Sequence, residues 1–488
     1  MNLIAQNPTR AALYVCLAVL AVHWLNQLGP TYGLMYDEAQ YWFWGKHPAF
    51  GYYSKPPMIA WAMGLSTALF GDHVFGVRLL APVLQLGTGL VLAATARLLG
   101  QSRDTAAWVL MIYVTLPLVS VNSNFFATDV PLLLCWSVAL YAAIKAITVP
   151  GAGRWWLVVG LASGLGLLSK YTMVAFGASV LLALITVPGA RRQFASPWLW
   201  LGVLLALALF APNLWWNAAH QFVTFQHTED NVITKQVTLY QRDLLIFTAA
   251  PLLLFGPWLS VALVRSLRGA RSDATLRSLH LFVWPLALTG ILISALASAQ
   301  AQWISPCYAA GTLAAVLWLR YTGRGHWLHA TLCFNLAMLA LFYATPSLLP
   351  HLPTRYDPLA RITVWNTLAE PVAQEVARYP DAVLVTDERK AAAALTYQLR
   401  ALRGTQTPVY KWPTPQVRDH YDLLTHETSL AGKPVLLVLR YNMPWELQPH
   451  AQLLQRLTIG RYHFALVYVP SFVTPAPPIK AGFSDSAR

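Results

Sequence analysis

Residues 36–61 read YDEAQYWFWGKHPAFGYYSKPPMIAW and concentrate reactive side chains in a chain that otherwise avoids charge. Asp37 and Glu38 are adjacent carboxylates, which can exchange protons with a substrate. Lys55 precedes two prolines, which restrict its backbone and so direct its ammonium, a group that binds phosphate. A structural alternative is that the acids start one helix at its positive end and the prolines start the next, with Lys55 reaching toward the membrane surface.

Two further ionisable residues lie beside strongly apolar runs. Asp129, in SNFFATDVPLLLCW, is expected to line an aqueous cavity or to bind a charged group, because ionisable groups near hydrocarbon are costly. It is equally suited to cap a helix, since Pro131 falls in the first turn. Lys170, in GLGLLSKYT, is predicted to have a phosphate or carboxylate partner, with an ordinary turn lysine as the alternative.

A polar segment, WWNAAHQFVTFQHTEDN, contains His220 and His227 close to Glu229 and Asp230. Such a set can hold zinc or another divalent ion. The seven-residue spacing of the histidines matches no common metal motif, so the pattern alone favours histidines that bind no metal.

The composition predicts a polytopic α-helical membrane protein. Of 488 residues, 56% are hydrophobic and 11% are charged, far fewer charges than in a soluble domain. About eleven segments are apolar and long enough to cross a bilayer, and the count could reach thirteen. The predicted spans are 11–28, 76–98, 107–122, 130–148, 155–168, 171–187, 198–216, 244–264, 280–298, 302–320 and 327–346. Four cysteines lie in these spans without metal or disulfide spacing and are predicted to be small core residues: Cys16, Cys135, Cys307 and Cys333.

The distribution of charge predicts the orientation. With a cytoplasmic N-terminus, most basic loop residues face the cytoplasm and most acids, including Asp37 and Asp129, face outward. The net charge of +14 then reflects topology and anionic lipid, so nucleic-acid binding is not expected.

The chain is predicted to have two domains. Residues 1–350 form the transmembrane domain, including a first outer loop at 29–75 in which an interfacial helix points Tyr41, Trp42 and Trp44 toward lipid. Residues 351–475 alternate helical and strand patterns, which indicates a small extracytoplasmic α/β domain, and 476–488 read as a flexible tail. No phosphate-binding nucleotide motif is present in the sequence.

These motifs resemble the lipid-linked-sugar glycosyltransferases of the GT-C superfamily, in particular the ArnT-like and PMT_2 group (glycosyltransferase family 39/83). The resemblance rests on YDEAQYWFW, GYYSKPPMIAW, FFATDVPLL and GLLSKYT, together with the span count and the C-terminal domain. It implies an enzyme that transfers a sugar, with inversion, from a polyprenyl-phosphate donor to an acceptor outside the cytoplasm, in a bacterial inner membrane with its active site facing the periplasm.

The resemblance also implies roles for individual residues. Asp37 would be the catalytic acid, with Glu38 and Asp129 as further acidic positions. Lys55 would approach the donor phosphate. The remaining substrate-binding positions would be Tyr41, Tyr52, Tyr53 and Lys170. His227, with His220, would lie where ArnT-like enzymes have a metal-binding loop histidine.

One departure bears on metal and substrate. ArnT-like sequences commonly have Glu-Lys-Pro-Pro, whereas this chain has Ser54 before Lys55, which removes a zinc ligand of the family. The YYSKPP form is more similar to the branch that contains lipopolysaccharide galacturonosyltransferases, so the substrate cannot be copied from the aminoarabinose enzyme. Lipid A or lipopolysaccharide core is the acceptor that the resemblance implies. A protein O-glycosyltransferase is the main alternative. A lipid or sugar transporter is disfavoured, because no repeat is visible and the charges gather at one face.

Overall fold

The computed structural model describes residues 7–29, 33–232, 241–296, 300–348, 359–404, 407–413, 419–426, 430–440 and 445–473. Contacts divide the chain into two compact units. The first, called the membrane unit, comprises Met1–Thr31 and Pro48–Ser347. The second, the C-terminal unit, comprises Tyr32–His47 and Leu348–Arg488.

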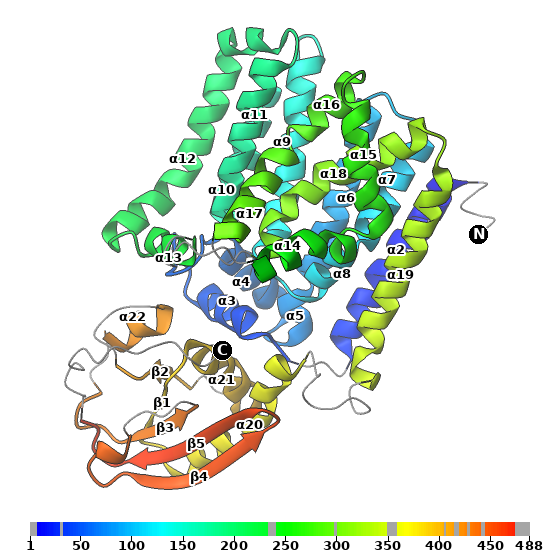
Figure 1. Cartoon of the computed structure of the whole chain (residues 1–488). Helices are drawn as coiled ribbons and strands as arrows, with labels where there is room; N and C mark the ends of the chain where they lie inside the picture. Colours follow the sequence, from blue (N-terminus) through cyan, green and yellow to red (C-terminus); the bar gives the residue numbers. More distant parts are fainter. Residues whose placement is uncertain are drawn as a thin grey trace. The chain divides into compact units, whose positions relative to one another are not determined.

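The membrane unit is helical throughout its described elements (Figure 1). Apolar runs fold as helices here because a helix satisfies its own backbone hydrogen bonds within lipid. Its α-helices are α2 (Pro8–Leu28), α4 (Met58–Phe70), α5 (Val74–Arg78), α6 (Leu80–Leu98), α7 (Arg103–Thr115), α8 (Pro117–Asn124), α9 (Asp129–Thr148), α10 (Trp155–Ser169), α11 (Val174–Thr186), α12 (Pro197–Ala219), α13 (Val223–Val232), α14 (Gln241–Leu254), α15 (Pro257–Gly269), α16 (Ala274–His280), α17 (Trp284–Leu296), α18 (Ser305–Tyr321) and α19 (Gly325–Leu348). Short 3₁₀ turns are η1 (Tyr171–Met173), η2 (Ala190–Ala195) and η3 (Ala301–Ile304).

The predicted count of eleven spans is not confirmed. Among the described residues, six spans are long and apolar enough to cross a bilayer, or eight if each of two bent helix pairs counts as one. The pair α14–α15, which covers the predicted span 244–264, bends by 106° and is either a broken span or a re-entrant loop. The pair α7–α8 bends by 54°. Helices α10 and α11, with 15 and 13 residues, fall short of a bilayer's thickness.

Helices α9, α10 and α12 lie side by side (Figure 1). Two glycines allow α10 and α12 to touch through their backbones. A Cβ atom on Gly160 would lie 2.1 Å from the carbonyl oxygen of Gly202, and one on Gly202 would lie 2.2 Å from that of Trp156. Small residues at such crossings are typical of helix packing in membranes. Asp129 begins α9, Lys170 directly follows α10 and His220 directly follows α12, so these three packed helices place predicted site residues at their ends.

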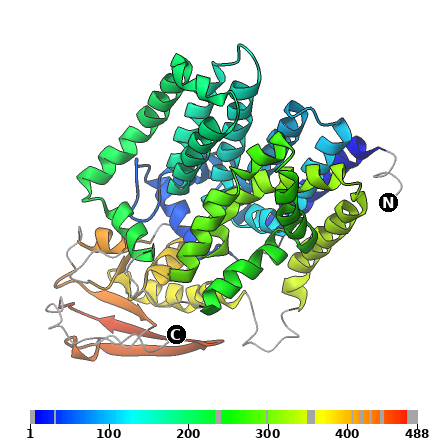
Figure 2. The ribbon, with the colours of Figure 1, turned by 45° about the horizontal axis from the view of Figure 1, so that its top comes forward.

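The C-terminal unit is an α/β structure, as predicted. Its five strands are ordered β2-β1-β3-β5-β4, with β1 parallel to β2 and β3, and β5 antiparallel to β3 and β4. Helices α20 and α21 lie along the sheet (Figures 1 and 2). The strands are β1 (Val383–Thr386), β2 (Val409–Lys411), β3 (Val435–Leu439), β4 (Gln452–Ile459) and β5 (Tyr462–Val469). The helices are α3 (Tyr36–Lys46), α20 (Ala360–Arg378), α21 (Arg389–Arg403), α22 (His420–His426) and the 3₁₀ turn η6 (Trp445–Leu447).

The alternating pattern predicted for 351–475 is confirmed where the sequence reads as strand in DAVLVTDER (β1), KPVLLVLRY (β3) and YHFALVYV (β5) and as helix in KAAAALTYQLRAL (α21). Strand β3 is buried along its whole length, which explains its continuous apolar pattern. Strands β2 and β4 were missed: β2 has three residues, and β4 is a largely exposed edge strand without a clean alternation. The predicted tail at 476–488 lies outside the described residues.

Helix α3 packs within the C-terminal unit, whereas the sequence assigned it to the transmembrane domain. The side chain of Trp42 is 1% exposed and lies edge-on to Tyr397 of α21, with ring centroids 5.2 Å apart. Trp44 is fully buried against His420. The prediction that these tryptophans face lipid is therefore wrong, because their apolar surface is buried on α21 and α22 instead.

Candidate functional site

The membrane unit contains a buried ion pair between two of the predicted site residues. Nζ of Lys170 donates hydrogen bonds to both carboxylate oxygens of Asp129, each at 2.9 Å. Oγ of Ser305 donates to Oδ1 of the same carboxylate at 2.5 Å. The sequence had left open a phosphate or carboxylate partner for Lys170, and the structure provides a carboxylate.

The alternative role of Asp129, as a helix cap, is not what the structure shows. The cap residue of α9 is Thr128, and no side-chain hydrogen bond is made there. Asp129 occupies the first position of α9 and uses its carboxylate on Lys170 and Ser305. Ser305, at the start of α18, was missed, because nothing in the sequence connects it with an acid 176 residues away.

The segment 50–53, just before Lys55, is fixed residue by residue to α12 and α13. Nδ2 of Asn213 donates to the Phe50 carbonyl at 2.6 Å. Gly51 leaves room for the ring of Trp216, which a Cβ atom would approach to 2.3 Å. In the same way, Thr224 donates to the Tyr52 carbonyl at 2.8 Å, and the Tyr53 ring lies 5.3 Å from that of His227.

The turn that follows presents Lys55. The Tyr52 N–H donates to the Lys55 carbonyl at 3.2 Å, and α4 begins at Met58, immediately after the two prolines. The two prolines therefore lie at a helix start, as the structural alternative predicts. The same turn also orders the Lys55 backbone. The Lys55 side chain is half-buried.

Tyr52 and Tyr53 are both buried. The Tyr52 hydroxyl accepts a hydrogen bond from the Ala49 N–H at 3.0 Å. Burial raises the pKa of Tyr52 to about 12, partly offset by that hydrogen bond. Tyr52 is therefore a neutral phenol near pH 7, and its aromatic body supports the loop.

One asparagine connects the Lys55 loop with the Lys170 segment. Asn213 bonds to the Phe50 carbonyl through Nδ2 and accepts a hydrogen bond from the Tyr171 hydroxyl at Oδ1, at 3.0 Å. Asn217, one turn further along α12, donates to the same Tyr171 hydroxyl at 3.3 Å. Because Tyr171 directly follows Lys170, both lysine-bearing segments are fixed by α12.

The C-terminal unit holds Asp37, in the first turn of α3. Its Oδ1 atom accepts a hydrogen bond from Nη1 of Arg389, on α21, at 3.0 Å. The same guanidinium donates to Oε1 of Gln40 at 2.6 Å. The Asp37 side chain remains 39% exposed. Arg389 was not predicted, because it lies 352 residues after Asp37 in the chain, in a region that the sequence indicates is a separate domain.

Glu38 and Tyr41 are both buried side chains of α3. Oε2 of Glu38, which is only 2% exposed, accepts a hydrogen bond from the Met35 N–H at 3.0 Å and so stabilises the first turn of α3. The Tyr41 ring is buried and tilted against Trp44, with centroids 5.5 Å apart.

The predicted histidines do not form a zinc site with the residues described. His220 ends α12; its Nδ1 bonds to the Trp216 carbonyl at 2.8 Å and its ring stacks on Trp216 at 4.0 Å. His227 lies in α13, so the expected loop is largely helical. Within the described parts of the chain, no group of three or more His, Cys, Asp or Glu side chains is placed to hold a metal. The side chains of Glu229 and Asp230 lie outside the described set.

An apolar cavity of about 480 Å³ lies among α14, α15, α17 and α18. This volume is in the range of ligand pockets in proteins. The 106° bend between α14 and α15 helps to shape it. It reaches Ile304, the residue before Ser305, and its lining includes Leu252, Val264, Ala287 and Ile291.

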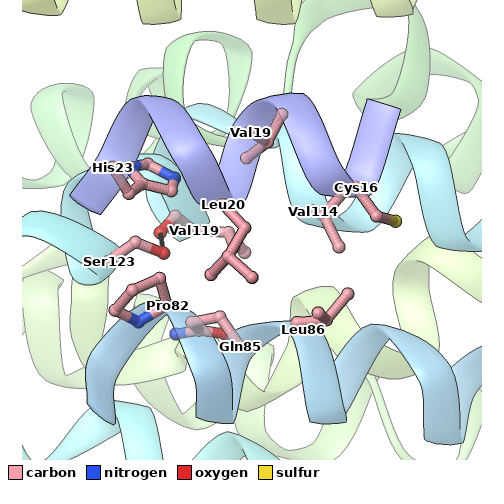
Figure 3. Close-up of a pocket in the computed structure, with 10 residues that line it drawn as sticks. All are labelled: Cys16, Val19, Leu20, His23, Pro82, Gln85, Leu86, Val114, Val119 and Ser123. Atoms are coloured by element: carbon pink, nitrogen blue, oxygen red, sulfur yellow. Dashed lines mark hydrogen bonds between the residues drawn. The ribbon is translucent and has the colours of Figure 1, made fainter. Parts of the chain in front are cut away.

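A second cavity, of about 10 Å³, lies between α2, α6 and the α7–α8 pair (Figure 3). His23, Gln85 and Ser123 are its polar lining residues. It has room for about one water molecule. This cavity is therefore too small for a substrate.

Comparisons with known proteins identify relatives of the chain. Residues 54–216 match a family model described as dolichyl-phosphate-mannose-protein mannosyltransferase. Lipid A galacturonosyltransferase RgtD of Rhizobium johnstonii is 35% identical over 373 residues, 75% of this chain and 77% of that protein. Undecaprenyl phosphate-alpha-4-amino-4-deoxy-L-arabinose arabinosyl transferase 1 of Pseudomonas fluorescens is 31% identical over 179 residues, 35% of this chain and 31% of that one. ArnT from Cupriavidus metallidurans bound to undecaprenyl phosphate has a similar fold, with a TM-score of 0.60, 18% identity and coverage of 93% and 97% of the two chains.

Proposed function

The chain belongs to the GT-C superfamily of lipid-linked-sugar glycosyltransferases, in its ArnT-like group, and we propose that it transfers galacturonic acid from a polyprenyl-phosphate carrier to lipid A. The observation that carries this proposal is the 35% identity with a lipid A galacturonosyltransferase over 77% of that protein. The carrier is proposed from the arabinosyl transferases, whose name includes undecaprenyl phosphate, and from the ArnT structure bound to that lipid.

In the proposed reaction, an acceptor hydroxyl of lipid A attacks the anomeric carbon from the face opposite the phosphate. The carbon–oxygen bond to phosphate breaks, and polyprenyl phosphate leaves with the bonding electron pair. The hydroxyl proton passes to Asp37, and the configuration at the anomeric carbon is inverted. No nucleotide is consumed, because the phosphate is already the leaving group.

Lys55 is the proposed donor ligand. Its ammonium would offset the charge that develops on the departing phosphate, and a fixed cation serves this purpose better than a mobile one. The anchoring of residues 50–53 by Asn213 and Thr224 supports this role, because it orders the turn from which Lys55 projects. Lys170 has three N–H donors, of which Asp129 takes two, so one remains to contact the phosphate.

The large apolar cavity is proposed to hold part of the isoprenoid chain. Its mostly apolar lining suits a hydrocarbon, and it includes Ile304, next to Ser305 of the Asp129–Lys170 cluster. An isoprenoid whose phosphate end lies on the Ile304 side would place that end near the cluster. No step of the proposed reaction is assigned to a metal.

The protein is proposed to lie in a bacterial inner membrane, with the C-terminal unit and the polar loops facing the periplasm. The concentration of basic residues in the opposite loops supports this orientation. A reporter fused to the C-terminus, active only in the periplasm or only in the cytoplasm, tests it.

Mass spectrometry of envelope lipids tests the function in cells. Lipid A and polyprenyl-phosphate sugars are compared between cells with the protein, without it, and with the Asp37→Asn variant. We expect lipid A to lose one hexuronic acid residue in the last two strains while the sugar-loaded carrier accumulates. An unchanged lipid A together with loss of a protein-bound glycan would instead support a protein acceptor, the alternative suggested by the name of the matching family model.

A further inference from the structure

Arg389 makes a directed contact with the carboxylate proposed to act as base. Its Nη1 atom lies 3.0 Å from Oδ1 of Asp37 and 2.6 Å from Oε1 of Gln40. Its guanidinium carbon lies 5.5 Å from the centroid of the Tyr36 ring. Positions 36, 37 and 40 cluster on one side of α3, so a single side chain of α21 covers the end of α3 that presents Asp37.

The contact is not explained by the local needs of α21. Arg389 is the first residue of this helix, where the helix dipole disfavours a cation. Glu388, the cap residue, makes no capping bond; its carboxylate binds Nη1 of Arg440 at 3.0 and 3.1 Å instead. The charge of Arg389 is therefore compensated chiefly by Asp37, across the two helices.

Packing of α21 on α3 fixes the direction of the guanidinium. Tyr397 lies edge-on to Trp42, and Arg400 lies over the same indole at 5.7 Å. These contacts lie two and three turns beyond Arg389 along α21, so the two helices are held along their length. Arg389 approaches Asp37 from a rigid element, as a group that orients another group must.

We infer that Arg389 is a positioning residue for sugar transfer, holding Oδ1 of Asp37 so that Oδ2 faces the acceptor hydroxyl. This inference rests on the proposed role of Asp37. Among the described residues, no hydrogen bond engages Oδ2, and the carboxylate is 39% exposed. As the new bond to the anomeric carbon forms, the hydroxyl proton moves to Oδ2 and the phosphate leaves with its electron pair. The C-terminal unit thereby contributes both Asp37 and the residue that positions it.

The ion pair itself is expected to contribute little to stability. Both side chains are about a third exposed, 30% for Arg389 and 39% for Asp37, and solvent and salt weaken ion pairs with this exposure. Removing Arg389 should therefore leave the fold intact, and a loss of activity can be assigned to the reaction.

Lys390 offers a matched control. It is the next residue on α21 and places its ammonium 5.3 Å from the same Tyr36 ring. In the described structure it makes no hydrogen bond or ion pair with Asp37. If activity depends only on positive charge at this end of α21, Lys390→Ala should lower kcat as much as Arg389→Ala does.

The test uses purified full-length protein with a galacturonic acid-loaded polyprenyl phosphate donor and lipid A. We expect Arg389→Ala to lower kcat by about tenfold or more, part of the roughly 10²–10⁴-fold that a positioned base contributes, with the donor KM and the thermal midpoint unchanged. Arg389→Lys should recover part of the lost kcat, and Lys390→Ala should behave as wild type. In an Asp37→Asn background, Arg389→Ala should have no further effect.

The outcomes separate this inference from the proposed function. Wild-type kcat in Arg389→Ala, with Asp37→Asn inactive, would overturn the inference and leave the role of Asp37 standing. Equal losses of activity and thermal stability in Arg389→Ala and Lys390→Ala would overturn it in favour of a structural role. Full activity of Asp37→Asn would remove the proposed base and the inference together.

Discussion

Nζ of Lys170 lies 2.9 Å from both carboxylate oxygens of Asp129, 41 residues earlier in the chain. The pair joins the start of α9 to the end of α10, and only 8% of the Asp129 side chain and 16% of the Lys170 side chain is exposed. Each charge thus has its counter-charge inside the membrane unit. A substrate phosphate at Lys170 would share the ammonium with Asp129 and would not meet a free cation.

Breaking this pair on one side should destabilise the protein more than removing it entirely. Asp129→Asn or Lys170→Gln alone leaves one mostly buried charge unpaired, at a cost of about 3–5 kcal/mol, whereas the double variant removes both charges. Thermal unfolding in detergent should therefore give lower midpoints for each single variant than for the double variant. Additive losses in the double variant would contradict a coupled pair.

Lys55→Ala should raise the donor KM by about tenfold or more, since a hydrogen bond to a charged group contributes roughly 1.5–3 kcal/mol. Lys55→Arg, which keeps the charge, should recover part of this loss. Initial rates at varied donor concentration give KM and kcat for each variant. An unchanged KM and kcat in Lys55→Ala would remove Lys55 from the donor site.

Asn213→Ala should weaken donor binding although Asn213 is not itself a proposed ligand. The substitution removes the hydrogen bond to the Phe50 carbonyl and the one from Tyr171, so it loosens both lysine segments. Asn217→Ala provides the comparison, because it removes a hydrogen bond to the Tyr171 hydroxyl and leaves the bond from Asn213 to the Phe50 carbonyl in place. We expect the donor KM to rise in the order wild type, Asn217→Ala, Asn213→Ala; equal KM values in all three would show that the anchoring is unimportant for the donor.

Filling the apolar cavity should discriminate between donors of different chain length. Ala287→Phe places a ring in the cavity and should raise the KM of a long polyprenyl donor while sparing a short-chain analogue. Leu288→Phe is the matched control, because Leu288, the next residue of α17, is 58% exposed and does not line the cavity. An equal rise in KM for the long and the short donor in Ala287→Phe would contradict the proposal that the cavity holds the isoprenoid chain.

The stability of the C-terminal unit should fall at acidic pH through His420. Burial, partly offset by Asp419, lowers the pKa of His420 from 6.5 to about 4. The unfolded chain therefore binds a proton more readily, so the stabilisation is complete above about pH 6.5 and is lost as the pH falls to about 4. Unfolding midpoints measured over this range should fall less steeply for His420→Gln than for wild type. If the midpoints of His420→Gln and wild type fall equally with pH, His420 is not the cause of the loss of stability.

The sequence predicted much of the architecture, and its errors have physical causes. Helical segments follow from apolar runs; Asp129 was identified because charge beside such a run is costly, and Lys170 because the positive-inside rule disfavours a lysine at the outer face. Composition cannot distinguish an aromatic residue that faces lipid from one that packs on protein, so Trp42 and Trp44 were placed wrongly. Ser305 and Arg389 were missed because their partners lie 176 and 352 residues away, beyond any local pattern.

The central claim is that this protein transfers galacturonic acid to lipid A with Asp37 as the base. Its most direct test is transfer by purified protein from a galacturonic acid-loaded undecaprenyl phosphate to lipid A, measured by mass spectrometry for wild type and Asp37→Asn. The account predicts one added hexuronic acid and released undecaprenyl phosphate with wild type, and neither product with a folded Asp37→Asn variant. Equal product from both proteins would contradict the role of Asp37, and no product from wild type would contradict the proposed donor or acceptor.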